Sequence, residues 1–543
     1  MTWSDRSDAT DVEPVNQSIT SPTLDTLFKR TLARQPEALA LVDPLNKQRV
    51  TGQTRKRLTY AQADRAISAI AAHFVEIGLP ANTVIAVQLP GTIEFVLTVL
   101  AAHRVGLVVV PLPLLWRQAE LTSVLNRTAA RAIVTCSRID GISYADLAMN
   151  AAAEAFSIRH VCGFGTDLPE GMSSLDQAIL EDSRTSRPMI QDGRKPALIS
   201  FDVTSDGFRP VPRAHFSLIA GGLAMSLESD LAQGATIMSA FAPMSFAGIC
   251  SSLVTWLLSG GTLVMHHPFD EDAFEAQFND HACDTLIAPA QLALRLDERG
   301  LSERLPSLRN VIGLWRMPEQ VASSAHWISR RVTMTDVYLF GEAGLFGARR
   351  TGEDGSPAPI KPGPHSAPRE APSASIAGEV LLTPKGTLGL RGPMVPVAAY
   401  APSSPPAESL IAPAPRDYVD TEYAARLEKQ LAESSLTEDK KTEERQRQIV
   451  HDELAEIVDK YGDERRTEII PATGDVTDED LIARENVVVT ITSTGYAKRT
   501  KVDSYKAQKR GGKGVRGAEL KQDDIVKNFF VCSTHDWILF FTN

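Results

Sequence analysis

The sequence has 543 residues, of which 43% are hydrophobic and 23% are charged. One hydrophobic core does not normally support a chain of this length, so we expect at least two domains, and the composition is that of an ordinary globular protein. The formal net charge of −11 argues against binding of nucleic acid or an anionic membrane over the whole surface, although a local basic patch can still act because salt screens charges beyond about 10 Å.

Residues 1–22 are polar and rich in acidic side chains, with no basic start and no apolar stretch, so they lack the pattern of a secretory or transit signal. The longest apolar run, 106–116, is too short to span a bilayer and contains two prolines. Five cysteines lie far apart without metal-ligand spacing, and we expect small buried residues in a reducing compartment: Cys136, Cys162, Cys250, Cys283 and Cys532. The sequence therefore predicts a soluble, cytoplasmic protein that makes no membrane contact.

Residues 23–350 alternate amphipathic helical patterns with short apolar runs rich in β-branched residues. Three helix–strand pairs open this pattern: 58–78 with 84–90, 92–106 with 107–112, and 120–132 with 132–136. The alternation returns in four later segments: 235–243, 252–265, 284–296 and 332–342. Strands separated by helices of this length are typical of βαβ units. The predicted fold class is therefore α/β, with largely parallel sheets flanked by helices.

The composition changes twice after residue 350. Residues 351–422 contain prolines at a density that excludes long helices and central strands, so we expect loops and edge strands there. Residues 423–461 contain no Pro or Gly, and their apolar residues recur three or four positions apart among many charges. This narrow apolar seam predicts a coiled-coil-like helix through which the chain could self-associate. Residues 462–543 have the alternating pattern of β-strands at 485–500 and again from 525.

A possible phosphate-binding loop lies in the segment LISFDVTSDGFRPVPRAHFSL, residues 198–218. A strand leads into Thr204, Ser205 and Gly207 and then into a basic turn. Hydroxyl and backbone N–H groups in such loops can hold phosphates. The segment is therefore a candidate nucleotide site.

Three histidines stand near this loop or near a strand end: His215, His266 and His267. They form no Ser-His-Asp or HxxxH grouping that would indicate hydrolase or metal chemistry. We expect them to have surface or capping roles.

Several segments between residues 24 and 427 resemble, in order and spacing, the adenylate-forming ligase superfamily, which includes acyl-CoA synthetases, aryl-acid-adenylating enzymes and adenylation domains of peptide synthetases. They include LTYAQAD, TSDGFRPVPRAH, APMSFAGICSSLVTWLLSGGTLVM, DVYLFGEAG, AGEVLLT, LRGPMV and DYVDTEYAARLE. The resemblance implies activation of a small carboxylic acid by ATP and Mg²⁺ to give an acyl-adenylate. The PVPRAH turn resembles that of the aryl-acid enzymes, but the acyl substrate stays open.

The resemblance assigns site residues position by position. It implies that Thr204, Ser205 and Gly207 belong to the loop that holds the ATP phosphates, with Arg209 at the position of the family's phosphate-binding lysine. In YLFGEAG it implies that Tyr338 and Gly341 belong to the nucleotide-binding turn. Glu342 stands at the position of the magnesium-binding glutamate. Glu342 and Arg209 are therefore the expected catalytic residues.

The chain departs from the family pattern in each of three motifs: the phosphate loop, the nucleotide-binding turn and the ribose-binding segment. Asp206 replaces a glycine and places a negative charge beside polyphosphate, Phe208 replaces a proline, and Gly341 replaces a threonine. Glu422 and Tyr423 stand where the family has the Gly and Asp of its ribose-binding Thr-Gly-Asp. No segment resembles the subdomain with the catalytic lysine, whose cation would stabilise the charge that develops during adenylation. We expect adenylation to be impaired or lost, with residual activity as the alternative.

The segment 496–521 carries nine Lys or Arg residues against two Asp or Glu, a local net charge of +7. It lacks the G-x-x-x-x-G-K-[ST] spacing of a nucleotide loop. From composition alone it can be a solvated basic hairpin or a patch that contacts nucleic-acid phosphates.

Residues 446–543 closely resemble bacterial DNA gyrase A, at the end of its coiled-coil arm and the start of its C-terminal pinwheel. QKRGGKG, residues 508–514, matches the family's gyrase-box heptapeptide. The resemblance implies DNA contact by the residues of this loop: Gln508, Lys509, Arg510, Gly511, Gly512, Lys513, Gly514 and Arg516. Nothing resembles the DNA-cleaving region, so we expect no strand cleavage by this chain alone.

The sequence thus predicts five segments: a polar tail (1–22), an adenylate-forming-like α/β core (23–350), a proline-rich β-containing remnant of the ligase domain (351–422), a charged helix (423–461) and a partial pinwheel (462–543). The leading functional hypothesis is an adenylate-forming protein fused to a gyrase A fragment. The alternatives are a gyrase-related DNA-binding protein and a chimera with neither activity.

Overall fold

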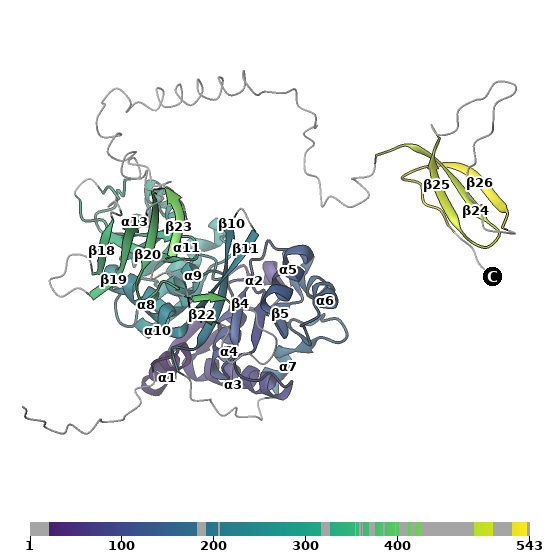
Figure 1. Cartoon of the computed structure of the whole chain (residues 1–543). Coiled ribbons are helices and arrows are strands. Elements are labelled where there is room, and N and C mark those ends of the chain that lie inside the picture. Colours follow the sequence, from purple (N-terminus) through teal and green to yellow (C-terminus); the bar gives the residue numbers. More distant parts are fainter. Residues whose placement is uncertain are drawn as a thin grey trace, which may run out of the picture. The chain divides into compact units, whose positions relative to one another are not determined.

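The computed structural model describes residues 21–181, 192–204, 207–316, 326–352, 355–357, 360, 362–368, 375–383, 386–396, 398–400, 411–413, 419–424, 483–502 and 524–539. The chain divides into two compact units, Met1–Lys440 and Lys441–Asn543 (Figure 1). This division falls within 427–446, where the two sequence resemblances meet. Each unit is described by itself below.

The first unit contains an eight-stranded sheet in the order β17-β16-β15-β14-β12-β13-β1-β2. Its strands are β1 (Leu39–Val42), β2 (Arg57–Thr59), β12 (Thr236–Ser239), β13 (Thr262–Met265), β14 (Thr285–Pro289), β15 (Asn310–Trp315), β16 (Thr333–Phe340) and β17 (Gly344–Arg349). The central pairs are parallel. The edge pairs, β1 with β2 and β16 with β17, are antiparallel.

A seven-stranded sheet in the order β11-β10-β4-β3-β5-β8-β9 lies in the same unit. Its strands are β3 (Val84–Val87), β4 (Val108–Pro111), β5 (Ala132–Cys136), β8 (His160–Phe164), β9 (Ser173–Ser174), β10 (Pro196–Thr204) and β11 (Gly207–Ala214). All its pairs are parallel except β10 with β11. A short ladder joins β6 (Arg138–Ile139) to β7 (Ile142–Ser143).

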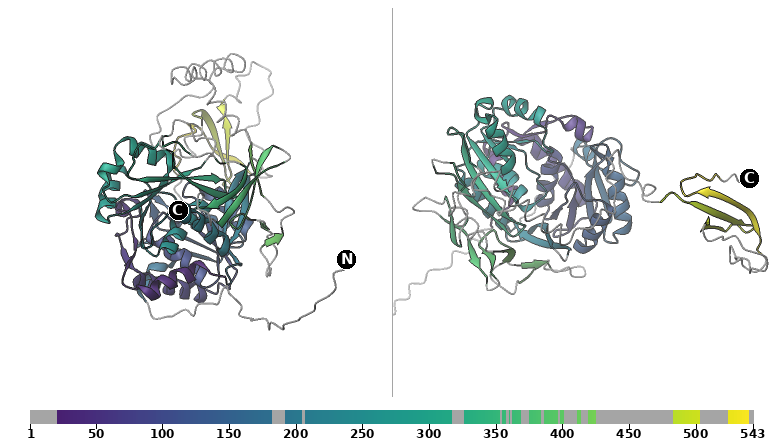
Figure 2. Two further views of the ribbon diagram at one scale, coloured as in Figure 1. Left: turned by 90° about the vertical axis from the view of Figure 1, so that its left-hand side faces the viewer. Right: turned by 90° about the horizontal axis from the view of Figure 1, so that it is seen from above.

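Helices lie against these sheets (Figure 2). They are α1 (Leu24–Arg34), α2 (Lys47–Thr51), α3 (Tyr60–Glu76), α4 (Ile93–Arg104), α5 (Gln118–Thr128), α6 (Tyr144–Glu154), α7 (Leu175–Leu180), α8 (His215–Glu228), α9 (Phe246–Gly248), the π-helix η1 (Ile249–Val254), α10 (Thr255–Ser259), α11 (Glu271–Asp280), α12 (Ala290–Glu298) and α13 (Leu301–Arg304). The predicted α/β class with largely parallel sheets is confirmed. Among the described residues, no helix has both the length and the apolar character needed to cross a membrane.

The elements begin and end where their sequences cap or bury them. The helix expected from residue 58 begins at Tyr60, because the Thr59 side chain accepts a hydrogen bond from the backbone N–H of Gln62 in a capping box. Every residue of β3 and of β5 is buried, as expected for parallel strands covered on both faces. These buried strands and the apolar helix faces form the hydrophobic core of the first unit.

The cysteine prediction is confirmed in part, and of the predicted surface or capping roles of the histidines the surface role is wrong at two positions. All five cysteines are free; Cys532 is half-buried and the other four are buried. His215 and His266 are buried rather than on the surface. Each accepts a backbone N–H at the start of a helix, His215 from Leu24 of α1 at 3.5 Å and His266 from Asp270 before α11 at 3.1 Å, which agrees with a capping role. The His215 ring packs edge-on against that of His103, with 4.6 Å between centroids, so its surroundings come from residues distant in sequence.

The proline-rich region contains β-structure, as expected for edge strands between loops. An antiparallel sheet has the order β18-β19-β20-β23, and a separate pair joins β21 to β22. The strands are β18 (Gly363–Ala367), β19 (Ser375–Leu382), β20 (Thr387–Arg391), β21 (Ala398–Tyr400), β22 (Ile411–Pro413) and β23 (Val419–Ala424). Tyr423 and Ala424 therefore end a strand and do not begin the charged helix. The rest of that predicted helix lies outside the described residues, so the helix and its self-association stay predictions.

The described part of the second unit is an antiparallel sheet in the order β25-β24-β26. Its strands are β24 (Asn486–Thr492), β25 (Ala497–Lys501) and β26 (Val526–Ser533). Asp524 accepts hydrogen bonds from the side chains of Ser493 (2.9 Å) and Thr494 (2.7 Å), and these bonds, that of Thr494 foremost, lower the pKa of Asp524 to about 2. The sheet is consistent with one blade of a β-propeller.

Candidate functional site

The predicted phosphate loop is the tip of the β10–β11 hairpin. The antiparallel ladder continues through Asp202 opposite Arg209 to Thr204 opposite Gly207. Only Ser205 and Asp206, which lie outside the described residues, separate the two strands. Thr204 and Gly207, which the sequence analysis assigns to the loop, therefore lie at the ends of the two strands, because strand pairing takes up their backbone.

One face of the hairpin is aromatic. Phe201 and Phe208 lie on neighbouring strands, and both contact Trp116, with ring centroids 6.0 Å and 4.7 Å from it. Because strand residues alternate between faces, Asp202 and Arg209 are directed to the opposite face. These aromatic contacts fix which face of the hairpin carries the charged residues.

Asp202 connects the hairpin to the turn between β16 and β17. Its Oδ2 lies 2.8 Å from Nη2 of Arg209, and its Oδ1 accepts a hydrogen bond of 3.1 Å from the backbone N–H of Glu342. Arg209 and Glu342, the two predicted catalytic residues, are thus joined through one aspartate. We call Asp202, Arg209, Arg213 and Glu342 the charge cluster.

Gly341 is required by the close approach of this aspartate. Its φ of +54° lies in the left-handed region, and a Cβ built on it would lie 2.5 Å from Oδ1 of Asp202. The family resemblance places a threonine here, but the carboxylate of Asp202 occupies the space that such a side chain would need. The Asp202 side chain and the glycine at position 341 are therefore sterically compatible with each other.

Glu342 is held by hydrogen bonds within the protein. Its Oε2 accepts a hydrogen bond of 2.9 Å from the backbone N–H of Phe246, the first residue of α9. Burial raises the pKa of Glu342, and the positive charge of Arg213 opposes that rise. A carboxylate oxygen is a suitable ligand for Mg²⁺, which proteins commonly hold with one or two carboxylates and substrate phosphates. The residue type at position 342 therefore fits the metal that the resemblance implies.

Arg213 is the buried cation of the cluster, with a relative exposure of 1%. Its Nη2 donates to the carbonyl oxygens of Glu342 and of Ala343, the latter at 3.1 Å, and its Cζ lies 3.7 Å from the ring centroid of Phe246. Its Nε and Nη1 have no hydrogen-bond partner among the residues that the structure describes. Burial lowers the pKa of Arg213 to about 10.

Sequence reasoning missed Asp202 and Arg213. A signal for Asp202 existed, because pairing of Thr204 with Gly207 places position 202 opposite 209. Arg213 lies four residues after Arg209 on β11, so strand alternation places both on one face. The structure adds both residues to the site.

The other predicted cofactor residues lie near the cluster in sequence. Tyr338 is buried on β16, where it is in register with Trp315 on β15 and Phe346 on β17. Thr204 and Gly207 end the hairpin strands, and Ser205 lies outside the described residues. In the described ranges, no three His, Cys, Asp or Glu side chains form a metal-binding group. The predicted DNA-contacting residues 508–514 and Arg516 also lie outside the described residues.

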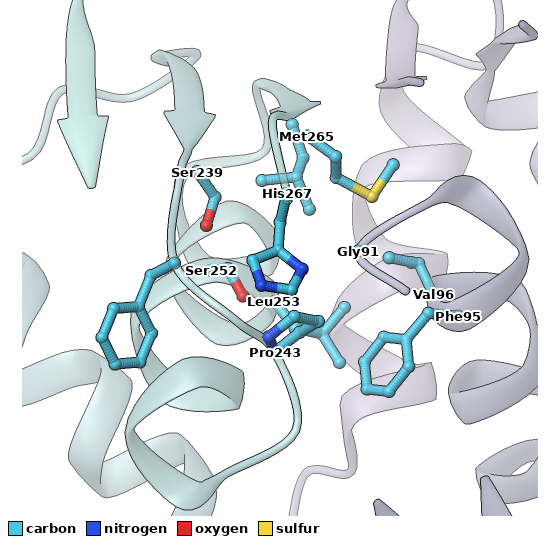
Figure 3. A pocket seen from close by; sticks show the side chains of 11 residues that line it. Gly91, Phe95, Val96, Ser239, Pro243, Ser252, Leu253, Met265 and His267 are labelled. Carbon is cyan, nitrogen blue, oxygen red and sulfur yellow. The ribbon is translucent and has the colours of Figure 1, made fainter. Parts of the chain in front are cut away.

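A second candidate is a small pocket where β12 and β13 end (Figure 3). The His267 ring lies between Ser239 and Ser252 on one side and Gly91 on the other. The Oγ of Ser239 and the Nδ1 of His267 have no hydrogen-bond partner in the described part of the chain. The cavity volume is about 10 Å³, which is space for roughly one water molecule. This pocket is therefore suited to a buried water and is too small for a substrate.

A family model described as AMP-binding enzyme matches residues 28–368, which include the whole charge cluster. A second model, the DNA gyrase C-terminal β-propeller domain, matches residues 486–533. The first match covers most of the first unit and the second covers the three-stranded sheet.

Two curated relatives match the C-terminal part. The chain is 79% identical to the DNA gyrase A protein of Mycolicibacterium smegmatis and 80% identical to that of Mycobacterium tuberculosis, in each case over 99 residues, or 18% of this chain. It spans 12% of the length of these relatives.

Two solved structures resemble the first part of the chain. An acyl-CoA synthetase of Brucella canis has a TM-score of 0.55 at 18% identity, and an anthranilate CoA ligase in complex with anthranoyl-AMP has a TM-score of 0.59 at 13% identity. Each comparison covers 74% of this chain and 75% of the other. At these identities the likeness is one of fold.

Proposed function

The chain belongs to the AMP-binding enzyme family, and from this premise we propose that its first unit activates a small carboxylic acid with ATP at the charge cluster, at a reduced rate. In the proposed reaction a carboxylate oxygen of the acid attacks the α-phosphorus of ATP. The bond to the bridging oxygen breaks, and pyrophosphate leaves with its electron pair. The products are the acyl-adenylate and pyrophosphate.

The observation that carries this proposal is the hydrogen bond between the Glu342 N–H and the Asp202 carboxylate. These residues are 140 positions apart. Glu342 belongs to the nucleotide-binding turn that the family resemblance assigns, and Asp202 lies two residues before the phosphate motif and opposite its Arg209. The bond brings the phosphate hairpin and the nucleotide turn into contact. This geometry supports a shared nucleotide site.

Each predicted residue has a proposed role in that site. Glu342 would provide a carboxylate ligand for Mg²⁺, which when bound offsets phosphate charge. Arg209 would bind phosphate oxygens through its guanidinium, and the hydroxyls of Thr204 and Ser205 would donate to them. Tyr338 and Gly341 would line the nucleotide, with Gly207 completing the hairpin tip.

The proposed reduction in rate rests on the ion pair between Arg209 and Asp202. An arginine already neutralised at 2.8 Å attracts a phosphate less than a free one. The negative charge of Asp202 also repels the polyphosphate directly. The Arg209 side chain is 43% exposed, so a ligand can still reach it.

The test is carboxylate-dependent exchange of pyrophosphate into ATP, with a panel of aryl and aliphatic acids. We expect slow exchange with at least one acid and its loss in Arg209→Gln. The exposed Arg65→Gln is the matched control, because it removes one positive charge outside the cluster. Absence of exchange with every acid in the panel would overturn the proposal.

A second candidate function is DNA binding by the second unit. The specific observation that favours it is that Lys498, Arg499 and Lys501 are exposed along β25, next to the basic segment that matches the gyrase box. Basic side chains bind DNA phosphates without sequence preference, and the affinity falls as salt rises. We propose such salt-sensitive binding without strand cleavage, and the similarity to the two mycobacterial DNA gyrase A proteins supports it.

DNA retention by the full chain at several salt concentrations tests this second function. The variant exchanges four basic residues for Gln: Lys509, Arg510, Lys513 and Arg516. Its matched control exchanges four exposed arginines of the first unit: Arg30, Arg55, Arg57 and Arg65. We expect only the first variant to lose retention and to reduce the salt slope. Equal behaviour of the two variants would reject the proposed DNA surface, and negative results in both assays would support a chimera with neither activity.

A further inference from the structure

We propose that Asp202 is a specificity-determining residue that makes the charge cluster select nucleotides with a short phosphate chain, with AMP bound at least as tightly as ATP. This inference rests on the proposed nucleotide site and names the ligand class that the site prefers.

The first support is the charge balance of the cluster. It contains two carboxylates, Asp202 and Glu342, and two guanidinium groups, Arg209 and Arg213, so its formal net charge is zero. Arg213 is buried and donates to backbone carbonyls, whereas Arg209 is paired with Asp202. A triphosphate gains no net attraction from this set, and each added phosphate charge meets the carboxylate of Asp202.

The second support is that Asp202 is anchored in place. Both of its carboxylate oxygens have partners, Oδ2 in Arg209 and Oδ1 in the Glu342 N–H. The side chain fills the space beside Gly341, where a Cβ would come within 2.5 Å of Oδ1. A ligand that recruits Arg209 must therefore displace a carboxylate held at two points. That cost falls most heavily on ligands whose binding depends on strong phosphate contacts.

A third observation identifies position 202 as the source of selectivity. Asp202 and Arg209 are directly opposite in the β10–β11 ladder, so backbone pairing keeps their side chains adjacent. The Asp202 side chain is 18% exposed, so a phosphate bound at Arg209 would be repelled by its negative charge. Removing that charge while keeping the side-chain shape changes the electrostatics and leaves the ladder intact.

The experiment is calorimetric binding of adenosine, AMP and ATP to the full chain in the presence of Mg²⁺, for wild type and Asp202→Asn. We expect the variant to bind ATP about tenfold more tightly, which corresponds to about 1.4 kcal/mol. AMP should gain about threefold, and adenosine should not change. The exposed Asp272→Asn is the matched control and should alter none of the three affinities.

The outcomes separate this inference from the proposed function. If wild type binds ATP and Asp202→Asn gains no more for ATP than for adenosine, the selectivity of Asp202 is overturned while the nucleotide site stands. If neither protein binds any of the three ligands, the proposed function and this inference both fail. If Asp202→Asn does not fold, as judged by its thermal transition, Asp202→Ser takes its place with the same expected order of gains.

Discussion

The carboxylate of Glu342 accepts a hydrogen bond from the backbone N–H of Phe246, with 2.9 Å between Oε2 and N. This bond ties the turn after β16 to the start of the α9–η1–α10 helical segment. The residue proposed to hold Mg²⁺ is therefore also part of the packing of the first unit. Its two roles can be separated, because the hydrogen bond needs only an acceptor oxygen and the metal needs a negative charge.

Exchanging Glu342 for Gln should separate them. The amide oxygen can still accept from Phe246, and a buried charge is removed, so the free energy of unfolding should stay within about 1 kcal/mol of wild type. The affinity for ATP in Mg²⁺ should fall at least about tenfold, because an amide is a poorer Mg²⁺ ligand than a carboxylate. Urea denaturation and calorimetry measure the two effects, with the exposed Glu298→Gln as control. Unchanged ATP affinity would contradict the metal role.

Arg213→Met should destabilise the first unit by about 3 kcal/mol, because it leaves buried polar groups without their cation. Arg213 opposes the burial-driven rise in the pKa of Glu342, so this pKa should rise further in the variant. A carboxyl whose pKa is higher in the folded than in the unfolded state adds to the free energy of unfolding at a pH below its unfolded-state pKa. That contribution is lost as the pH rises through the folded-state pKa. The cost of Arg213→Met should therefore be larger at pH 8 than at pH 5.

Urea denaturation of the Arg213→Met and Arg209→Met variants at pH 5 and pH 8 measures the loss in the free energy of unfolding that each exchange causes. Arg209 is 43% exposed on its side chain, and its exchange should cost less than about 1 kcal/mol. Equal costs at the two positions would show that Arg213 has no special role in the fold.

Gly341→Thr should cost about 2 kcal/mol, because it combines a left-handed backbone with a collision against Asp202. Part of that cost should disappear in the Asp202→Ser background, with a coupling energy of at least about 1 kcal/mol in a double-mutant cycle. Gly234→Thr is the matched control, because Gly234 has φ +75° but nothing within 4 Å of its added Cβ. It should cost strain alone and show no coupling to Asp202→Ser.

Lys47 is a buried ammonium between two buried carboxylates, with its Nζ 2.7 Å from Asp43 and 2.6 Å from Glu94. Burial, with a contribution from the charge of Glu94, raises the pKa of Asp43 to about 6. Lys47→Met should lower the free energy of unfolding by about 3–5 kcal/mol at pH 8. The loss should be smaller at pH 5, because the raised pKa lets a carboxyl become neutral as pH falls.

Chemical denaturation at both pH values measures this difference, with the more exposed Lys29→Met as control. A cost that is the same at pH 5 and pH 8 would mean that neither carboxyl takes up a proton when its ammonium is removed.

His103 should make the first unit acid-sensitive. Burial lowers its pKa to about 4. Between about pH 6.5 and pH 4, this histidine is therefore protonated in the unfolded chain and neutral in the folded chain. Stability should fall by about 3 kcal/mol as pH decreases through that window. His103→Gln, whose amide can still donate to the Ala197 carbonyl that His103 contacts at 3.0 Å, should reduce this fall. A midpoint of urea denaturation with the same pH dependence as wild type would contradict the assignment.

The regular elements of the first unit were predictable because their signals are local. The strands at 84–90 and 132–136 are short apolar runs, and the helix from Tyr60 starts at a Thr cap that is visible in the sequence. The division into an AMP-binding part and a gyrase-like part also followed from contiguous residues. The strand positions of Thr204 and Gly207 were not predictable, because Ser, Thr and Gly are typical of loops and the sequence does not show which residues pair across two strands.

The sequence by itself determined the α/β class, the resemblances to two families and the identity of Arg209 and Glu342 as candidates, since composition, periodicity and motif order depend on neighbouring residues. Only the tertiary structure decided that Asp202 neutralises Arg209 and fills the space beside Gly341, and that Arg213 and His215 are buried. The Asp202–Arg209 pair depends on the register of one hairpin, and the contacts of Asp202 with Gly341 and of His215 with His103 join residues more than a hundred positions apart. Charge balance and steric fit depend on the distances between pairs of side chains, and these distances are known only from the three-dimensional structure.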